Sequence, residues 1–268
     1  MYKRQIYDRQ KTDFPKYDYI IVSNEIEGWP EPESLLRLVR KSLSPTGKLL
    51  LSVNNRLGIR YFCGDRDPYT GRNFDGIENY RRAYSKKEDT FNGRMYSKSE
   101  WEQMLRNAGF DTYQFYSILS DLDNPSLIFA EDYLPNEDLA NRVFPTYNYP
   151  DSVFLEEEAL YAGLLENGMF HSMANAYLIE CSKDGALSDV DHVTASLERG
   201  REDALFTIIH KSGIVEKRAA YPEGQHRLEQ LIANATDLKQ HGISVVEAAL
   251  DGQSYVMPYI EAEVGQVY

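Results

Sequence analysis

The sequence has few residues of the kinds that build disulfide frameworks, metal centres or membrane spans. Only two of its 268 residues are cysteine and five are histidine. Cys63 and Cys181 lie in no CxxC or Cys/His spacing, and the histidines form no HxxxH pair, so we expect reduced thiols and no metal site. No run of about 18 apolar residues occurs, so no membrane-spanning helix is expected. No signal-peptide pattern is present either, and together these absences predict a cytoplasmic protein.

Basic side chains are also scarce relative to acidic ones. The chain has 29 lysines and arginines against 42 aspartates and glutamates, which gives a net charge of −13. Nucleic-acid binding relies on clustered positive charge, so this balance argues against a broad nucleic-acid interface. Apolar residues make up 42% and charged residues 26%, as is usual for globular proteins, and the length suits one or two domains. The oligomeric state is not fixed by this composition.

The first clear pattern in the chain is a strand, a helix and a second strand. Phe14–Val22 is a β-rich apolar run, which predicts a buried strand. Leucine and valine then recur at helical spacing over Glu33–Leu43, and Lys48–Val53 is a second apolar run. Between them, Ser44–Gly47 predicts a turn in which Gly47 has a positive φ. This order is a βαβ unit and predicts an α/β fold with a mostly parallel sheet.

The middle of the chain begins with a long loop rich in polar and aromatic residues, Asn54–Tyr84. Loops of this length are usually functional in compact domains. A helix is predicted over Ser97–Ala108, because Ser97 and Glu100 have the spacing of a capping box. Strands are predicted at 110–119, 125–130 and 174–181, and an acidic helix at 156–166 whose first residues, Glu156–Glu158, we expect to be solvated.

A polar stretch with a glycine, Lys183–Asp191, is the best domain boundary in the sequence. Beyond it the pattern predicts two β-hairpins that flank a helix, with strands at 204–210, 214–219, 245–250 and 254–260 and the helix at 225–240. This order is typical of a small α+β module. We therefore divide the chain into a first domain over 6–185, a linker over 186–203 and a second, partial domain over 204–268.

Both ends of the sequence have features of a fragment. Met1–Gln5 (MYKRQ) resembles the translation of a transposon-end adapter used in sequencing libraries, so we treat it as an artefact. A buried parallel strand needs neighbours on both sides, yet Phe14–Val22 stands almost at the beginning of the chain. The chain also stops soon after a predicted strand, without a closing helix. We expect the sequence to be an internal part of a longer protein.

Polar residues follow the first two predicted strands. Ser23, Asn24 and Glu25 come directly after the first strand, and Asn55 and Arg56 follow the second. Ligands of open parallel sheets bind outside the carboxyl ends of the strands, so these side chains are candidates for contacts with a nucleotide-like ligand and with a substrate. Asparagine and serine also satisfy turn backbone at strand ends, and position alone does not separate the two roles.

The segments YDYIIVSNEIEGW and LLRLVRKSLSPTGKLLLSV resemble the second half of a class I S-adenosylmethionine-dependent methyltransferase. The loop that follows, NNRLGIRYFCGDRDPYTGRNFDGIENY, is similar to NRxGxxYFxGxxxDxTGxxFxGIxxY, the loop of a bacterial subgroup of these enzymes found near glycan-assembly genes. Pro68 stands where that pattern has an aspartate. The resemblance extends over residues 14–182 and implies a Rossmann-like fold with S-adenosylmethionine as the methyl donor.

The same resemblance implies roles for individual residues. Ser23, Asn24 and Glu25 would line the donor site, and the substrate loop would contribute Asn55, Arg56, Tyr61, Thr70 and Asp75. The family's glycine-rich donor loop has no counterpart in the sequence, so we expect this chain alone to bind S-adenosylmethionine weakly. A sugar hydroxyl would need a base. The candidates are Glu25, Asp65 and Asp75, each of which would alternatively face solvent or pair with a nearby arginine.

The C-terminal module resembles the small lobe of a kinase-like fold, through GIVEKRAAYPEG, the helix QHRLEQLIANATDLKQ and the strand SYVMPYIE. In that fold a strand lysine reaches the ATP phosphates and pairs with a glutamate on the following helix, and Lys217 and Glu229 would take these places. No glycine-rich loop precedes Lys217. ATP binding is therefore one interpretation, and an exposed strand lysine is the other.

Methyltransferase–kinase fusions that modify bacterial surface polysaccharides have this domain order. Together the two resemblances imply an S-adenosylmethionine-dependent methyltransferase that acts on a cell-surface glycan or glycolipid acceptor, or on its precursor. Two alternatives stay open: a non-catalytic glycan-assembly module, and a kinase with a vestigial methyltransferase half.

Overall fold

The computed structural model describes residues 15–86, 88–135, 137–183 and 185–261, so residues 1–5, predicted to be an artefact, lie outside the described part. The described strands are β1 (Tyr17–Ser23), β2 (Leu43–Asn54), β3 (Thr112–Leu119), β4 (Leu127–Ala130), β5 (Ala176–Ser182), β6 (His192–Ala195), β7 (Leu205–Ile209), β8 (Ile214–Ala219), β9 (Ala249–Asp251) and β10 (Ser254–Pro258). The α-helices are α1 (Pro32–Ser42), α2 (Ile59–Phe62), α3 (Lys98–Asn107), α4 (Tyr161–Glu166) and α5 (Gln225–Gln240). Short 3-10 helices include η1 (Glu25–Gly28) and η4 (Glu157–Leu160).

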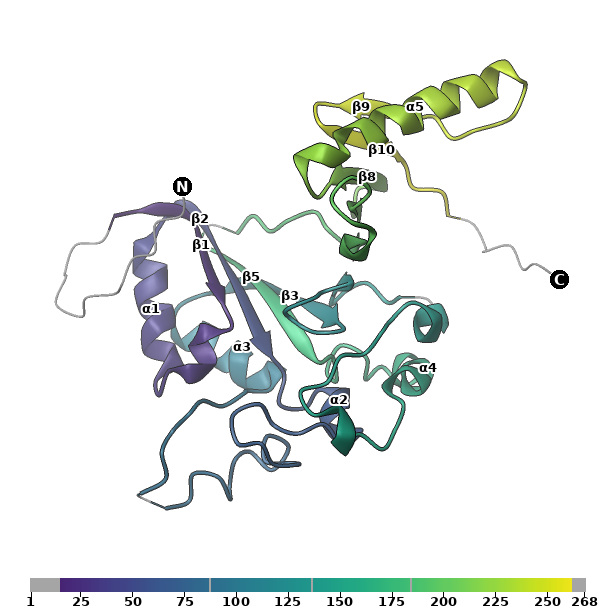
Figure 1. Ribbon diagram of the computed structural model, residues 1–268. Coiled ribbons are helices and arrows are strands. Elements are labelled where there is room, and N and C mark those ends of the chain that lie inside the picture. Colours follow the sequence, from purple (N-terminus) through teal and green to yellow (C-terminus); the bar gives the residue numbers. More distant parts are fainter. Residues whose placement is uncertain (1–14, 87, 136, 184, 262–268) are drawn as a thin grey trace.

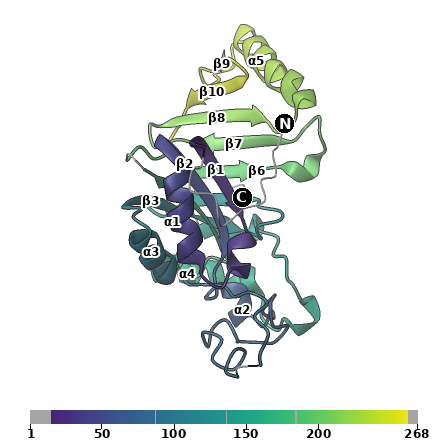
Figure 2. The same cartoon turned by 90° about the vertical axis from the view of Figure 1, so that its left-hand side faces the viewer.

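These strands form one large sheet in the order β1-β2-β5-β3-β4-β6-β7-β8-β10-β9. Helices α1 and α3 accompany the first strands of this order, and α5 accompanies the last ones (Figure 1). Figure 2 shows that β6, β7 and β8 run across the direction of β1 and β2. The fold is therefore α/β with a single strongly twisted sheet. None of the described helices is long and apolar enough to cross a membrane.

The predicted βαβ unit is confirmed, because β1 and β2 pair in parallel and α1 connects them. The turn between helix and strand differs from the prediction. Gly47 does not have a positive φ and lies inside β2 instead. A Cβ atom at this position would come within 2.7 Å of the Tyr17 carbonyl oxygen, so the glycine allows the close approach of two strands rather than a turn.

The expectation of a mostly parallel sheet is wrong for the described residues, because β1 and β2 form the parallel pair and the other pairings are antiparallel. Strand β5 enters between β2 and β3 and runs against both of them. Strands β1, β2 and β3 consequently point the same way. The direction of β5 depends on pairing between segments far apart in the sequence, which local periodicity does not encode.

One face of β1, β2 and β5 packs against α1 and α3. The buried residues that these helices contribute are Leu36, Val39, Trp101 and Leu105. Helix α3 begins at the predicted capping box, in which the Ser97 hydroxyl accepts from the Glu100 N–H and the Glu100 carboxylate accepts from the Ser97 N–H. The capping box fixes where α3 starts, and the apolar stripe of α3 faces the sheet.

Strand β1 is half-buried rather than buried. Ile20 and Val22 pack against the core, whereas Tyr19 and Ile21 on the opposite face are 63% and 70% exposed. An apolar run of this kind is typical of a strand covered on both faces. The described residues cover only the face of β1 that α1 and α3 occupy.

A second apolar cluster lies around α2, α4 and the strands β3 and β4, and its largest members are Phe129, Tyr161 and Phe170. The predicted acidic helix is divided here into η4 and α4. Glu157, expected to be solvated, has no exposed surface. Its carboxylate accepts hydrogen bonds from the Tyr161 hydroxyl and the Asn175 amide, because η4 turns it toward β5.

The C-terminal elements continue the same sheet. The stretch predicted as a linker, 186–203, contains β6, which pairs with β4 on one side and with β7 on the other. The predicted order of two hairpins around a helix is confirmed as β7-β8-α5-β9-β10. The division into two domains and the likeness to a kinase-like lobe stay predictions.

Candidate functional site

The polar residues that follow β1 and β2 lie side by side. The Asn24 N–H donates to the Ser52 carbonyl oxygen at 3.0 Å, and the Asn54 side-chain amide donates to Asn24 Oδ1 at 3.1 Å. Asn24 has a φ of 56°, a left-handed conformation that asparagine tolerates better than most residues. The prediction that the two stretches meet at one end of the sheet is confirmed.

A pocket of about 280 Å³, here called the strand-end pocket, opens at this end of the sheet. Its lining comes from the ends of β1 and β2, the loop that contains α2, the turn after β3 and the segment before α4, as Asn24, Asn54, Arg60, Pro68, Tyr69, Asp121, Leu122, Asp123 and Asn148. The carboxyl ends of β1, β2 and β3 meet here because these strands point the same way. Ligand sites in open α/β sheets occupy this position.

Of the three residues predicted to contact a donor, only Asn24 lines this pocket. The Ser23 side chain is exposed, and its hydroxyl accepts a hydrogen bond from the Ser52 hydroxyl at 3.3 Å. Glu25 opens η1 with an exposed side chain. Asn54, which also follows from the strand-end argument, lines the pocket beside Asn24.

Glu27, which was not among the predicted site residues, is fully buried behind the pocket residues Asn54 and Tyr69. Its Oε2 accepts from the Tyr69 hydroxyl at 2.6 Å and from the Asn54 amide at 3.3 Å, and its Oε1 accepts from the Asn54 N–H. Burial raises the pKa of Glu27 to about 7, although the hydrogen bonds from Tyr69 and Asn54 oppose this effect. A carboxyl group of this pKa changes its protonation state at neutral pH.

The sequence offers no signal that separates Glu27 from Glu25. Both are glutamates of the same short stretch after β1, and both belong to η1. The 3-10 turn decides which of them faces inward, and it does so by burying Ile26 and Glu27 together. A residue that sits two positions further along a turn is therefore the one placed at the site.

Asp65, a predicted base, has a structural role. It is fully buried and forms an ion pair with Arg60 at 2.9 Å. It also accepts from the N–H groups of Asn148 and Tyr149 at 3.0 and 2.8 Å. These contacts fasten the segment around Asn148 to the loop, and they leave the carboxylate without access to solvent or to a substrate.

Asp75, the third predicted base, pairs with Arg72 at 2.8 Å and is also buried. The neighbouring Asp67 holds the loop more directly. Its Oδ1 accepts from the Tyr69 N–H at 2.9 Å, and its Oδ2 accepts from the Tyr80 hydroxyl at 2.7 Å. Burial raises the pKa of Asp67, against these hydrogen bonds. Both carboxylates therefore shape the loop from inside.

Three residues predicted to contact the substrate lie inside the protein instead. Asn55 is fully buried and donates to the carbonyl oxygen of Ala174 at 2.8 Å. Arg56 pairs with Glu100 at 2.7 Å and so joins the loop to α3. Tyr61 is 3% exposed, and its hydroxyl contacts the Met95 sulfur. The loop motif is thus largely a scaffold, because most of its polar groups are used to hold a long irregular backbone.

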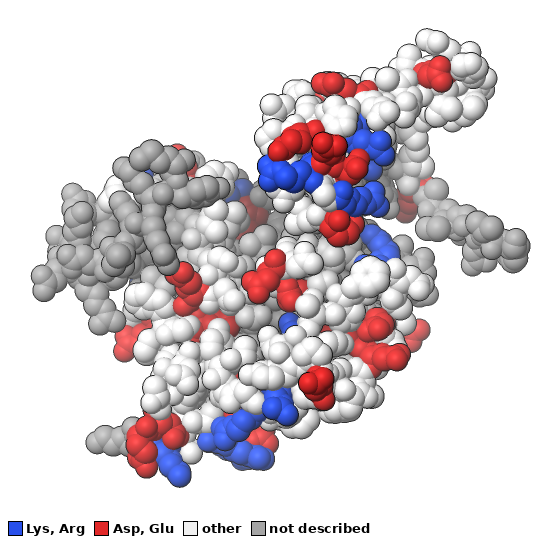
Figure 3. All heavy atoms as spheres, in the orientation of Figure 1, with Lys and Arg blue, Asp and Glu red and all other residues white. Residues whose placement is uncertain are grey.

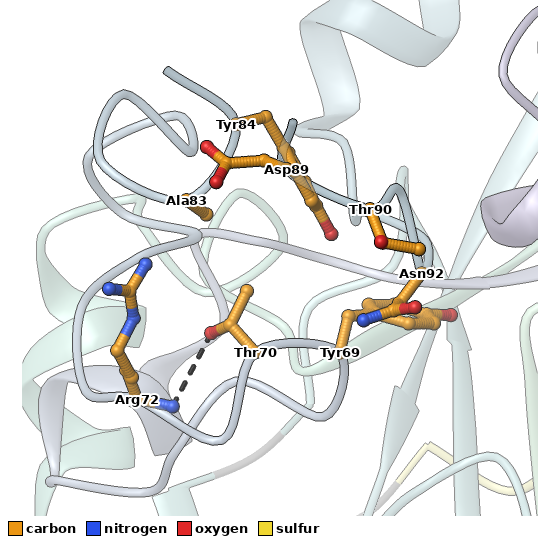
Figure 4. Close-up of a pocket in the computed structure, with 8 residues that line it drawn as sticks. All are labelled: Tyr69, Thr70, Arg72, Ala83, Tyr84, Asp89, Thr90 and Asn92. Atoms are coloured by element: carbon orange, nitrogen blue, oxygen red, sulfur yellow. Dashed lines mark hydrogen bonds between the residues drawn. The ribbon is translucent and has the colours of Figure 1, made fainter. Parts of the chain in front are cut away.

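A second pocket of about 400 Å³, here called the loop pocket, lies within the long loop and is lined by Tyr69, Thr70, Arg72, Ala83, Tyr84, Asp89, Thr90 and Asn92. Figure 4 shows Tyr84 and Asp89 across the pocket from Thr70 and Arg72, with Tyr69 and Asn92 together at one end. Thr70, a predicted substrate residue, is therefore placed at a pocket. Tyr69 borders both pockets, so the strand-end pocket and the loop pocket meet at its side chain.

Charge is mixed on the face that Figure 3 shows, where acidic and basic side chains alternate without one broad area of either sign. Within the described ranges, no group of three or more histidine, cysteine, aspartate or glutamate residues is arranged to bind a metal ion. Both cysteines are buried, and burial raises the pKa of Cys63 to about 11. The chemistry of the site therefore comes from amides, carboxylates and tyrosines.

The chain matches no protein-family model, and no curated protein matches it. It is similar to solved structures of methyltransferases. One is an S-adenosylmethionine-dependent methyltransferase from Thermotoga maritima, with 15% identity, 62% of this chain and 55% of that chain covered, and a TM-score of 0.33. Another, from Haloferax volcanii, is in complex with the Trm112 activator, with 16% identity, coverage of 68% and 61%, and a TM-score of 0.36.

A third, from Bacillus halodurans, has 18% identity, coverage of 65% of this chain and 68% of that chain, and a TM-score of 0.31. The chain thus spans between 55% and 68% of the length of these structures. All three TM-scores are below 0.5, so the similarity assigns no activity to this chain. Any function has to be argued from the two pockets.

The residues predicted to bind ATP lie at the other end of the sheet. Lys217 is in β8 and is half-buried, and burial together with the charge of Arg199 lowers its pKa. Glu229 is exposed on α5. No ion pair between Lys217 and Glu229 is present among the described residues, because Glu229 points to solvent. Their proposed nucleotide role stays a prediction.

Proposed function

We propose that this chain belongs to an S-adenosylmethionine-dependent methyltransferase that acts in the cytoplasm on a hydroxyl group of a cell-surface glycan or its precursor. The observation that carries the proposal is the contact between Asn24 and Asn54 at the ends of β1 and β2, in one pocket with Asp121. This agrees with the sequence resemblance, which assigns the residues after the first strand to the donor and those after the second to the substrate.

The side chains of the strand-end pocket suit such a donor. Asp121 and Asp123 are carboxylates that would face the positive charge of a sulfonium group favourably. The amides of Asn24 and Asn54 both donate and accept, as hydrogen bonds with ribose hydroxyls require. When bound, the donor supplies an electrophilic methyl group. The contribution of the protein is to orient the acceptor toward it and to place charge around it.

The loop pocket supports a sugar as the acceptor. It combines two tyrosine rings with the charged and amide groups of Arg72, Asp89 and Asn92. Aromatic rings pack against the C–H faces of sugars, while such polar groups bond to their hydroxyls. Because Tyr69 borders both pockets, a sugar in the loop pocket would present a hydroxyl next to the donor.

The test uses the product of the complete open reading frame, with S-adenosylmethionine labelled in its methyl group and the methyl glycosides of mannose, galactose and rhamnose as acceptors. We expect label to appear in at least one sugar. Asn24→Gly preserves the left-handed backbone but removes the amide, and should weaken donor binding about tenfold, the effect of one lost hydrogen bond. Asn234→Ala, exposed on α5, is the matched control and should bind the donor normally.

Two results would count against the proposal. One is an open-reading-frame product that does not bind S-adenosylmethionine in equilibrium dialysis. The other is donor binding that Asn24→Gly and Asn234→Ala affect equally. Binding of the sugars without any transfer of label would instead support a non-catalytic glycan-binding module.

A further inference from the structure

We propose that Tyr69 takes the proton from the acceptor hydroxyl and passes its own proton to Glu27. The inference rests on the proposed function and names the proton acceptor that methylation of a hydroxyl needs. Two observations lead to it. Tyr69 is the residue that borders both the strand-end pocket and the loop pocket. Its hydroxyl already donates to Glu27 Oε2 at 2.6 Å, a short bond to a buried carboxylate.

The position of the Tyr69 ring is fixed from two sides. Asp67 Oδ1 accepts from the Tyr69 N–H at 2.9 Å and from the Thr70 N–H at 3.0 Å, which sets the turn that carries the ring. On the other side, a Cβ atom at Gly93 would come within 2.5 Å of the ring, and Gly93 has a φ of 131°. The ring therefore fits only because this position is glycine.

Glu27 is suited to receive the proton because it is buried and close to neutrality in its titration. Burial raises its pKa to about 7, so at neutral pH it is ionised in a substantial fraction of molecules and binds a proton readily. The titratable side chains that face it electrostatically are Tyr61 from α2, Asp67 and Tyr69 from the loop, and Tyr96 from the segment before α3.

Tyr69 cannot act alone as the base. Burial and the charge of Glu27 raise the pKa of Tyr69 far above its ordinary value, so its phenolate form is strongly disfavoured. A relay avoids that form, because the tyrosine oxygen gains one proton while it gives up another. Tyr69 is thus the catalytic residue, and Glu27 acts through it.

The step balances with the sulfonium donor as the co-reactant. The acceptor oxygen forms a bond to the methyl carbon as the carbon–sulfur bond breaks, and the bonding pair leaves with sulfur. The hydroxyl proton moves to the Tyr69 oxygen, and the Tyr69 proton moves to Glu27. The positive charge of the donor and the negative charge of Glu27 both disappear, so no net charge is created in the site.

Other carboxylates near the loop are less suited to this role. Asp65 is committed to Arg60 and to backbone donors, and Asp75 to Arg72. Asp67 uses both oxygens to hold the loop. Glu27 differs from them because one of its contacts, the Tyr69 hydroxyl, belongs to a side chain that lines a pocket on each side.

The first test measures kcat against pH for methyl transfer to the best of the three methyl glycosides. Wild-type kcat should rise with pH through an inflection near pH 7, where Glu27 loses its proton. Tyr69→Phe and Glu27→Gln should each lower kcat about a hundredfold and abolish this inflection, with the KM for S-adenosylmethionine nearly unchanged. Glu27→Asp should recover part of the rate. Tyr113→Phe and Glu31→Gln, outside both pockets, are the matched controls.

A second measurement needs no activity. Infrared difference spectra between pH 5 and pH 8 should show the C=O band of a protonated carboxyl group that Glu27→Gln removes. The Tyr69 hydrogen bond lowers the pKa of Glu27, so Tyr69→Phe should move the titration of this band to higher pH. A Tyr69→Phe enzyme with the wild-type rate and pH profile, or with an unshifted band, overturns the relay. A wild-type enzyme that transfers no label overturns the proposed function itself.

Discussion

The two ends of the sheet bury very different amounts of apolar surface. Both core clusters are built from residues between Ile26 and Cys181. Beyond residue 192, the buried apolar residues of the described part are only Ala204, Val215, Leu228 and Tyr255. Helix α5 has sixteen residues, and Leu228 alone is buried. Apolar burial is the main source of stability, so the first end should hold the sheet together and the second should open more readily.

Buried carboxylates behave in opposite ways at the two ends. Burial dominates at Glu27 and raises its pKa to about 7. Glu216, in β8, is 8% exposed, and burial also acts to raise its pKa, but hydrogen bonds from Ser254, Arg218 and His210 outweigh it and lower the pKa. A carboxylate with enough donors stabilises its surroundings as an anion. Glu27 lacks charged donors, and it is the one that lies at the site.

The largest expected effect is the removal of the biggest side chain from the first core. Trp101 is fully buried on α3, and its ring meets Tyr96 edge-on at 5.1 Å. Trp101→Ala should lower the unfolding free energy by about 3–5 kcal/mol in urea denaturation followed by circular dichroism. Leu228→Ala at the other end should cost about 2 kcal/mol, the low end for such changes, because few apolar neighbours surround it. Equal losses would contradict the comparison.

The next effect is the pH dependence that Glu27 confers. Glu27 titrates near pH 7 in the folded chain and near 4.5 when unfolded. Between these values the folded chain keeps a proton that the unfolded chain releases, so its stability falls as pH rises, by about 3 kcal/mol in total. Urea denaturation at pH 5 and pH 8 should show this loss for the wild type but not for Glu27→Gln. Exposed Glu31→Gln should follow the wild type, and parallel curves for all three would refute the assignment.

Glu216 should show the opposite sign. Its pKa is lowered in the folded state, so its contribution is present above pH 4.5 and disappears as the pH falls below that value. Glu216→Gln should therefore cost more stability at pH 7 than at pH 3.5, measured by the same denaturation series. If Glu216→Gln and Glu27→Gln changed with pH in the same direction, the contrast between the two carboxylates would fail.

Local patterns in the sequence predicted the elements of both ends well. The capping box of Ser97 and Glu100 placed the start of α3, and helical spacing placed α1 and α5 within one or two residues. The meeting of Asn24 and Asn54 followed from a rule about strand ends that needs no side-chain detail. These features depend on neighbours in the sequence, which is why they could be predicted.

Features that depend on distant segments were predicted poorly. The antiparallel entry of β5 between β2 and β3 and the burial of Glu157 by Asn175 both need tertiary contacts. The loop motif was read as a substrate surface because its polar residues are numerous. In the structure, Asn55 and Arg56 bond to the protein itself, and spacing along the chain does not show which polar groups are left for a ligand.

A smaller effect should come from the cap of α3. The Ser97 hydroxyl accepts from the Glu100 N–H and so satisfies a helix-end donor, whereas no side chain caps the start of α5 at Gly224. Ser97→Ala should lower the unfolding free energy by about 1 kcal/mol. Ser212→Ala, in the exposed β7–β8 turn, should be neutral. A Ser97→Ala chain as stable as the wild type would show that core packing alone fixes α3.

The smallest effect should come from the ion pair that joins the two ends. Lys211, in the β7–β8 turn, meets Asp132, just after β4, at 2.5 Å. Burial acts to raise the pKa of Asp132, but the Lys211 hydrogen bond outweighs it and lowers the pKa. Asp132 is 56% exposed, so solvent screens the pair, and a double-mutant cycle with Asp132→Asn and Lys211→Met should give about 0.5 kcal/mol or less.

This coupling should exist above pH 3.8, the ordinary value for Asp132, and disappear as the pH falls below it, because the lowered pKa stabilises only the ionised form. It should also fall in high salt. The pair Lys239–Glu247, which lies wholly within the second end, is the control of similar length at 2.6 Å. A coupling across the two ends several times that of the control would mean that the thinly packed end depends on Lys211 and Asp132 for its attachment, rather than on the strand pairing of β6 with β4.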